Sequence, residues 1–326
     1  MCSKYFITLS LTFAINIINA QSIATSSITS GGLEAGSNGQ KNTFYGYQSG
    51  KINTSSGISN SFFGHQTGIA NTNGHSNTFI GNTAGITNTT GASNVYLGHE
   101  SGKASSSGNE NVYLGVYAGG ENESGSGNTF IGHNAGGEAQ GSNNIFIGSY
   151  SGYYEHTSNK LIINNSFNTS PLIWGDFALD LVKLNGKVGI GSGFGNFPTT
   201  AGGVNLNTYN LFVKGGILTE EVRVNLQSAW ADYVFQPEYK LPTLAEVEKH
   251  IQDKGHLINV PSATQVAEEG IALGEMTKIQ QEKIEELTLY ILQQNRINEV
   301  QNQKLEQQSK EIDELKKLVQ NLIDKK

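Results

Sequence analysis

Residues 94–115 read NVYLGHESGKASSSGNENVYLG. A five-residue signature occurs twice within these 22 positions: asparagine, any residue, an aromatic residue, any residue and glycine. The signature occurs seven times in all, and successive copies begin 16 to 18 residues apart. Another glycine follows each copy four residues later. Seven units in one register predict an array in which each unit forms one structural turn. The copies begin at Asn42, Asn60, Asn77, Asn94, Asn111, Asn128 and Asn144 and end at Gly46, Gly64, Gly81, Gly98, Gly115, Gly132 and Gly148.

The residues of one unit indicate how such a turn folds. Threonine or valine, an aromatic residue, and isoleucine or leucine favour a short strand. The first glycine ends the strand, and the second permits a turn with positive φ. About 17 residues are too few for a strand and a helix but enough for one turn of a β-coil, so the fold class predicted for residues 42–158 is a mainly β repeat. In that β-solenoid, the asparagines are expected to stack as a side-chain ladder that bonds turn amides.

The aromatic residue and the isoleucine or leucine after it are neighbours in sequence, so their side chains face opposite sides of the strand. One side can fill the core of the coil, and the other needs a second cover. A second copy of the chain is one such cover, which predicts a homo-oligomeric β-roll or β-prism. The alternative is a monomeric two-sheet coil whose own loops cover the second face.

The composition limits the classes of protein to consider. Glycine makes up 40 of the 326 residues, charged residues only 15 %, and the net charge is −7. No basic surplus exists to neutralise phosphates, so nucleic acid is not expected as a partner. The charge-poor, glycine-rich chain is also unlike an ordinary enzyme.

The N-terminus predicts export. Lys4 precedes an apolar run from Tyr5 to Ile18, and Ala20 then gives a small residue at a cleavage position, as in a secretory signal peptide over residues 1–20. A buried N-terminal strand or helix is the alternative. The lone cysteine, Cys2, would be lost on cleavage, so disulfides and thiolate metal sites are not expected. Residues 21–41 are a Ser/Gly-rich linker, and no later segment is apolar enough to span a membrane.

Residues 159–229 are expected to form a strand-rich neck with Asn/Gly turns. No nucleophile elbow, phosphate loop or zinc-binding helix motif is present, so no catalytic residue, cofactor or metal site is predicted. His65, His99 and His133 occupy alternate repeats; they could form a metal or anion site around a symmetry axis, but polar turn residues explain them better. A catalytic set is suggested only by residue type for Asp232, Glu238, His250 and His256. Roles as helix-capping residues and surface charges explain these four residues better.

Two segments complete the chain: a small α+β module at residues 230–276 and a long helix at residues 277–326. The helix has a heptad register with apolar ends and a polar middle. Isoleucine at heptad position a with leucine at heptad position d alone favours a dimeric coiled coil. Layers of polar residues at these positions instead fix the register and the number of chains. The residues predicted to mediate oligomerisation as a coiled coil are Ile284, Leu287, Ile291, Asn298, Leu305, Ile312, Leu315, Val319 and Leu322, with Gln294, Gln301 and Gln308 at the central d positions.

The repeat signature resembles the head repeats of trimeric autotransporter adhesins and similar bacterial surface fibres. The run from Trp230 to Tyr290 is similar to a module at the C-termini of secreted, tail-fibre-like proteins of Gram-negative bacteria, where it closes a repeat fibre. These resemblances imply a homotrimer, secreted or held at the cell surface, that acts as a non-enzymatic structural or adhesive fibre with a glycan or surface ligand as partner. The alternative function is a phage-derived tail fibre or spike that binds or hydrolyses glycans.

Overall fold

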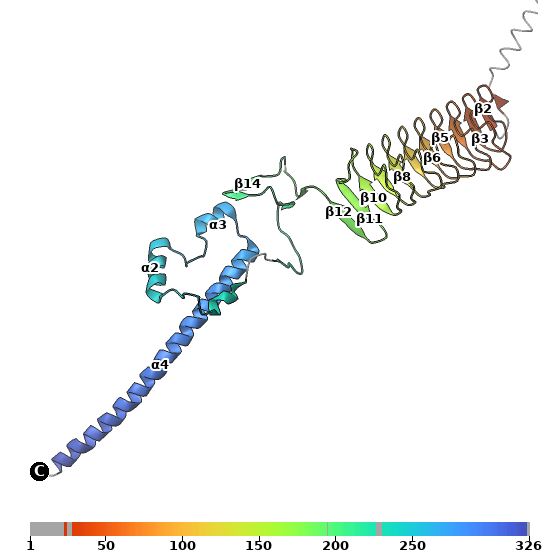
Figure 1. Cartoon of the computed structure of the whole chain (residues 1–326). Helices are drawn as coiled ribbons and strands as arrows, with labels where there is room; N and C mark the ends of the chain where they lie inside the picture. The colour runs from red at the N-terminus through yellow and green to blue at the C-terminus, as the bar shows by residue number, and fades with distance from the viewer. Residues whose placement is uncertain (1–22, 25–27, 194, 226–229, 325–326) are drawn as a thin grey trace, which may run out of the picture. The chain divides into compact units, whose positions relative to one another are not determined.

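The computed structural model describes residues 23–24, 28–193, 195–225 and 230–324 (Figure 1). The chain divides into two compact units, Met1–Val188 and Gly189–Lys326. The signal peptide predicted at residues 1–20 lies outside the described residues.

The first unit is a β-solenoid in which each turn contributes one strand to a parallel sheet, as Figure 1 shows. The solenoid with rungs of about 17 residues predicted from the repeats is therefore confirmed. Successive strands pair in register, so that Tyr96 lies beside Tyr113 and Leu97 beside Leu114. The parallel strands are β2 (Ile28–Gly31), β3 (Asn42–Tyr45), β4 (Ser61–Phe63), β5 (Thr78–Ile80), β6 (Val95–Leu97), β7 (Val112–Leu114), β8 (Thr129–Ile131), β9 (Ile145–Ile147) and β10 (Lys160–Ile163).

The stack extends beyond the seven signatures at both ends. Strand β2, within the predicted linker, pairs in parallel with β3, and β10, at the start of the predicted neck, pairs in parallel with β9. Three antiparallel strands flank the parallel stack: β1 (Ile23–Ala24) pairs with β2, β11 (Ile173–Asp176) with β10, and β12 (Leu181–Leu184) with β11. Lys160 and Asp176 form a 2.8 Å ion pair across the β10–β11 edge, and its hydrogen bond lowers the pKa of Asp176.

Backbone hydrogen bonds join neighbouring turns around the coil as well as in the strands. In the turn that follows β6, the amides of Gly102, Ala104 and Ser106 donate to carbonyls one turn later, at N···O distances of 2.7 to 2.9 Å. Stacking therefore satisfies turn amides that an isolated repeat would leave to water.

One column of aromatic rings fills the centre of the coil. From Phe44 to Phe146 the ring centroids are 4.6 to 5.2 Å apart, and from Phe62 onward the interplanar angles are 10° or less. All the rings are fully buried, and small residues such as Ala84 and Ala118 pack beside them. Burial of large apolar side chains is the main stabilising contribution expected for such a narrow core. The column consists of Phe44, Phe62, Phe79, Tyr96, Tyr113, Phe130 and Phe146.

The two glycines of a repeat serve different steric needs. Gly98 has φ +140°, and a Cβ there would lie 2.3 Å from the Gly115 carbonyl oxygen of the next turn. Gly102 has φ +60°, and a Cβ there would lie 2.6 Å from the Tyr96 ring of its own turn. The first glycine therefore sets the spacing between turns, and the second lets the backbone fold over the ring.

The second unit begins with short strands and ends with helices. β13 (Val188–Ile190) pairs with β16 (Leu211–Val213), and β14 (Thr200–Ala201) forms a hairpin with β15 (Val204–Asn205). A 3-10 helix, η1 (Ala231–Phe235), precedes α2 (Leu244–Lys254), α3 (Ala263–Glu269) and α4 (Leu273–Ile323). The predicted long C-terminal helix is confirmed as the 51-residue α4. Among the described residues, no helix combines the length and apolarity needed to cross a membrane.

Candidate functional site

The seven signature asparagines form a ladder that connects each turn to the next through backbone groups. Asn94 is fully buried; its Oδ1 accepts from the Asn111 amide at 2.9 Å, and its Nδ2 donates to the Gly108 carbonyl at 2.7 Å. The ladder begins at Asn42, whose Oδ1 accepts from the Asn60 amide, and ends at Asn144, whose Oδ1 accepts from the Lys160 amide. Each carboxamide thus satisfies one donor and one acceptor that the turns would otherwise bury unpaired.

A second buried column, which the sequence analysis did not single out, runs eleven residues after the first. Asparagines of this column bond their own turn, and some also bond a neighbouring turn; for example, Asn71 Nδ2 donates to Asn53 Oδ1 at 2.7 Å and to the Gly74 carbonyl at 3.1 Å. The constant spacing of eleven residues from the signature asparagine could have revealed this column in the sequence. Serine and alanine replace asparagine in two of the turns, so the pattern is less regular. The column contains Asn53, Asn71, Asn88, Ser105, Asn122 and Ala139.

Two tyrosines in the aromatic column allow a matched test of this second column. Tyr96 shares a 2.8 Å hydrogen bond with Ser105 Oγ, whereas the Tyr113 hydroxyl is buried with no hydrogen-bond partner among the described residues. Because an unpaired buried hydroxyl is costly, we expect Tyr113→Phe to stabilise the solenoid by about 1 kcal/mol and Tyr96→Phe to destabilise it by about 1 kcal/mol. Equilibrium denaturation of both variants measures the difference, and equal effects would contradict this assignment.

The outer face of the parallel sheet carries two columns of side chains. The column after the ring is apolar throughout, whereas the column before the ring is mixed and contains Thr43, Ser61, Thr78, Val95, Val112, Thr129 and Ile145. Residues that flank the aromatic ring in each strand point outward, and Val95, Leu97, Val112 and Leu114 are 37 to 42 % exposed. The apolar column after the ring continues in register along the sheet, from Tyr45 at one end to Ile147 at the other. A contiguous exposed apolar face on a narrow coil is typical of an interaction surface.

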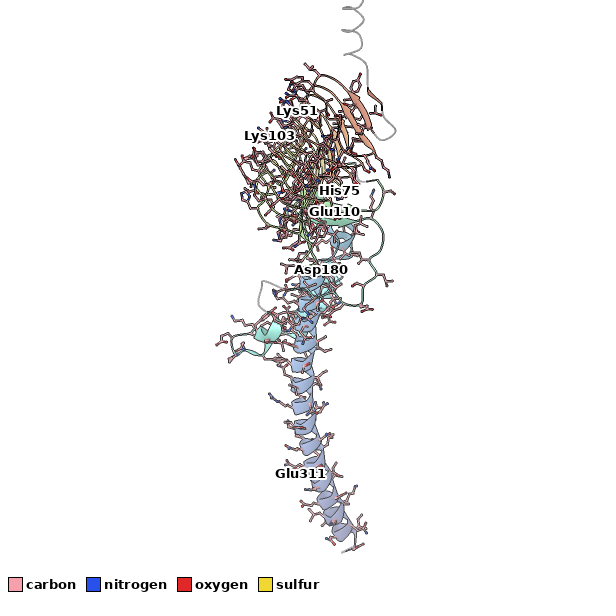
Figure 2. All side chains as sticks on the ribbon, turned by 90° about the vertical axis from the view of Figure 1, so that its right-hand side faces the viewer. Lys51, His75, Lys103, Glu110, Asp180 and Glu311 are labelled. Atoms are coloured by element: carbon pink, nitrogen blue, oxygen red, sulfur yellow. The ribbon has the colours of Figure 1, made fainter. Side chains whose placement is uncertain are left out.

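A second apolar surface runs along α4. The apolar residues among the predicted a and d positions are more than half exposed, from 51 % for Ile312 to 69 % for Leu322. Figure 2 shows side chains projecting from the helix on all sides around Glu311. Asn298 and the central glutamines lie on the same exposed stretch. A 51-residue helix with an exposed 3.5-residue seam matches the geometry of a coiled-coil strand.

The small module occupies a different side of α4. Tyr233 of η1 donates a hydrogen bond to Glu282, and Tyr239 donates one to Glu286. Lys283 Nζ lies 2.8 Å from each of these two carboxylates. The hydrogen bond to Glu282, together with burial, raises the pKa of Tyr233 to about 12. Burial raises the pKa of Glu282, but hydrogen bonds from Lys283 and Tyr233 outweigh it and leave that pKa below the ordinary value.

This network fixes the module against α4 and leaves the heptad seam uncovered. Glu282, Lys283 and Glu286 fall at heptad positions f, g and c, whereas Ile284 and Leu287 at a and d remain 57 and 58 % exposed. One turn of the helix therefore holds its own module on one side and presents an apolar stripe on the other.

The structure separates the polar residues considered for chemistry. The three histidines are exposed, each in its own turn. The His65 ring stacks on Tyr47, and the His133 ring contacts Tyr150 edge to face. His99 Nε2 lies 3.9 Å from Oε1 of the adjacent Glu100. Among the described residues, no group of three or more histidines, cysteines or acidic residues could hold a metal ion.

In the C-terminal module, the rings of His250 and His256 pack edge to face, with centroids 5.4 Å apart. Asp232, in η1, and Glu238, in the turn after it, are exposed. The contact packs the ring of α2 residue His250 against His256, which lies just after the helix ends.

Comparison of the chain with protein-family models, curated proteins and solved structures finds no significant match. The fold and surfaces define a class of architecture: a β-solenoid of about eight turns followed by helices, the last of them long, consistent with a structural fibre.

Proposed function

We propose that this chain is an exported, non-enzymatic fibre protein that assembles as a homotrimer and presents its solenoid for attachment to a surface. The observation that carries the proposal is the pair of exposed apolar surfaces, the outer sheet face and the α4 seam. Both are periodic and both suit a second copy of the same chain, because identical rungs and identical heptads match in register.

The stoichiometry of three is supported by the resemblance of the rungs to the heads of trimeric autotransporter adhesins. Polar a and d residues in the middle of the seam, such as Asn298 and Gln301, supply layers that select register and chain number at a cost in stability. Export is supported by the apolar run that precedes Ala20 in the sequence. Assembly would raise the effective concentration of the heads at a surface, which strengthens weak attachment.

Light scattering on the purified complete chain tests the assembly, and we expect three times the mass of one chain. Leu97→Glu together with Leu114→Glu places carboxylates in the outer sheet face. We expect this variant to assemble less, and its heads to be more open to proteolysis where they no longer pack against another chain. Val116→Glu is the matched control, because Val116 is 45 % exposed but lies in a turn after the strand. A chain that remains single at high concentration would reject the proposal.

Attachment is a separate measurement on the assembled protein. Binding of the full chain to a glycan array and to matrix-coated plates should exceed that of the dissociated form, because multivalency raises avidity. Release of reducing sugar from a bound glycan would instead favour a phage-derived spike with hydrolytic activity.

A further inference from the structure

The last turn of the solenoid contains a cluster of aromatic rings that no other turn has. In the two positions after the second glycine of each repeat, the six earlier turns carry lysine, isoleucine, alanine, threonine, glycine or glutamate, whereas the turn after Gly152 carries Tyr153 and Tyr154. The repeat thus provides an internal comparison, since the same backbone positions need no aromatic ring to fold. Tyr153, Tyr154 and Phe167 pack edge to face, with centroids 4.8 to 5.6 Å apart.

These rings surround a cavity at the end of the core column. Ile162 follows Phe146 in the column and Trp174 follows Ile162 across the sheet, so the regular stack of rings stops there. The chain then leaves the coil through residues 164–171 instead of making another turn. A cavity of about 380 Å³ remains, within the range of small-molecule sites, lined by Tyr150, Tyr153, Tyr154, Glu155, Phe167 and Trp174 among others.

A simple end cap does not account for this arrangement. Terminal units of a solenoid usually present a polar outer face that keeps the core from water. Here Tyr154 is 57 % exposed and Phe167 is 58 % exposed, although both border the cavity. Large rings kept in water beside a concave site indicate a ligand that covers them.

The polar groups of the cavity are held in place. Glu155 Oε1 accepts hydrogen bonds from the Thr157 amide at 2.9 Å and from the Thr157 hydroxyl at 2.5 Å. In the loop, Asn168 Oδ1 accepts from Asn164 Nδ2 at 3.0 Å and from the Ser170 amide at 3.1 Å. The site therefore combines aromatic faces with oriented carboxylate and amide groups, and little ordering is needed on binding.

From this geometry we infer that the cavity binds a neutral pyranose ring of a glycan. One face of a pyranose presents C–H groups that pack on an aromatic ring. Its equatorial hydroxyls can donate to Glu155 Oε2 and to the side-chain oxygen of Asn164, which accept no hydrogen bond from the described residues. The Glu155 carboxylate and the net charge of −7 disfavour an anionic sugar. The inference rests on the proposed attachment function, for which it names the site and the ligand class.

Tryptophan fluorescence of the complete chain reads this site directly. The sequence has two tryptophans, so Trp230→Phe leaves Trp174 in the cavity wall as the sole tryptophan. We expect a saturable change in its emission with methyl β-glucoside, methyl β-galactoside or N-acetylglucosamine, and none with sorbitol, an open-chain polyol without a ring. Tyr154→Ala and Phe167→Ala should each weaken binding at least about tenfold. Tyr209→Ala, which removes an exposed ring outside the cavity, should leave it unchanged.

Light scattering on the same samples separates this inference from the assembly proposal. Failure of every pyranoside to change the emission of a chain that keeps its full assembled mass would overturn the sugar site alone. An emission that acrylamide does not quench would also overturn it, because the chain itself would then fill the cavity. Sugar binding by a chain that scatters as a single copy would retain the site and reject the trimer.

Discussion

Replacing Asn94 by alanine should cost the solenoid about 2–6 kcal/mol. The carboxamide is fully buried and pairs with the Asn111 amide on one side and the Gly108 carbonyl on the other. Alanine leaves both backbone groups buried without a partner, and each such group costs about 1–3 kcal/mol. Because Asn94 lies in the middle of the stack, the loss weakens the coupling of two neighbouring turns.

Asn82→Ala is the matched control, since Asn82 is an exposed asparagine in the preceding turn. We expect it to change stability by less than about 0.5 kcal/mol. Denaturant unfolding followed by circular dichroism compares the two variants at constant protein concentration. Equal stabilities for Asn94→Ala and Asn82→Ala would show that the ladder contributes no more than a surface amide.

The solenoid could be predicted from the sequence because every turn repeats the same local requirements. An asparagine, a central ring and a glycine recur at a nearly constant interval, and each has a steric or hydrogen-bonding reason to be there. Alternation also placed Tyr96 and Leu97 on opposite sides of the strand. The structure buries the ring and turns both of its neighbours outward. Local rules repeated seven times leave little freedom for another fold.

The ends of the stack and the second polar column could not be read in the same way. Strands β2 and β10 join the sheet without the signature asparagine and ring, so backbone pairing with a preformed neighbour decides their structure. In the second column, Ser105 and Ala139 replace asparagine, because a turn can satisfy its amides through neighbouring carbonyls. The aromatic cavity depends on where the chain leaves the coil, which is a tertiary feature absent from the repeat.

The helix seam was predicted from the heptad pattern, but the sequence could not show that the module leaves it uncovered. That result depends on Tyr233 and Tyr239, which are distant in sequence from Glu282 and Glu286 and bond them through the fold. The seam is therefore available to a partner chain even where the module binds α4, and the first two heptads become the place to test assembly.

Serine at Ile284, Leu287 and Ile291 together should convert the assembled protein into single chains. These three side chains are 57 to 60 % exposed on α4 and form consecutive a, d and a layers of the seam. Removing them eliminates the apolar end of the seam that precedes the Asn298 and Gln301 layers. The polar layers cannot replace it because they select register at a cost in stability, and the apolar layers from Leu305 onward lie beyond them. Light scattering should then give the mass of one chain at concentrations where the unaltered chain assembles.

The same number of serines placed off the seam provides the control. Leu292, Ile297 and Val300 are 49 to 53 % exposed on the same helix but occupy positions b, g and c. Their replacement lowers helix propensity by a similar amount and should leave the mass unchanged. Circular dichroism confirms that both variants keep α4. If the seam variant retains the assembled mass, the helices do not join the chains, and the outer face of the solenoid alone must hold any oligomer together.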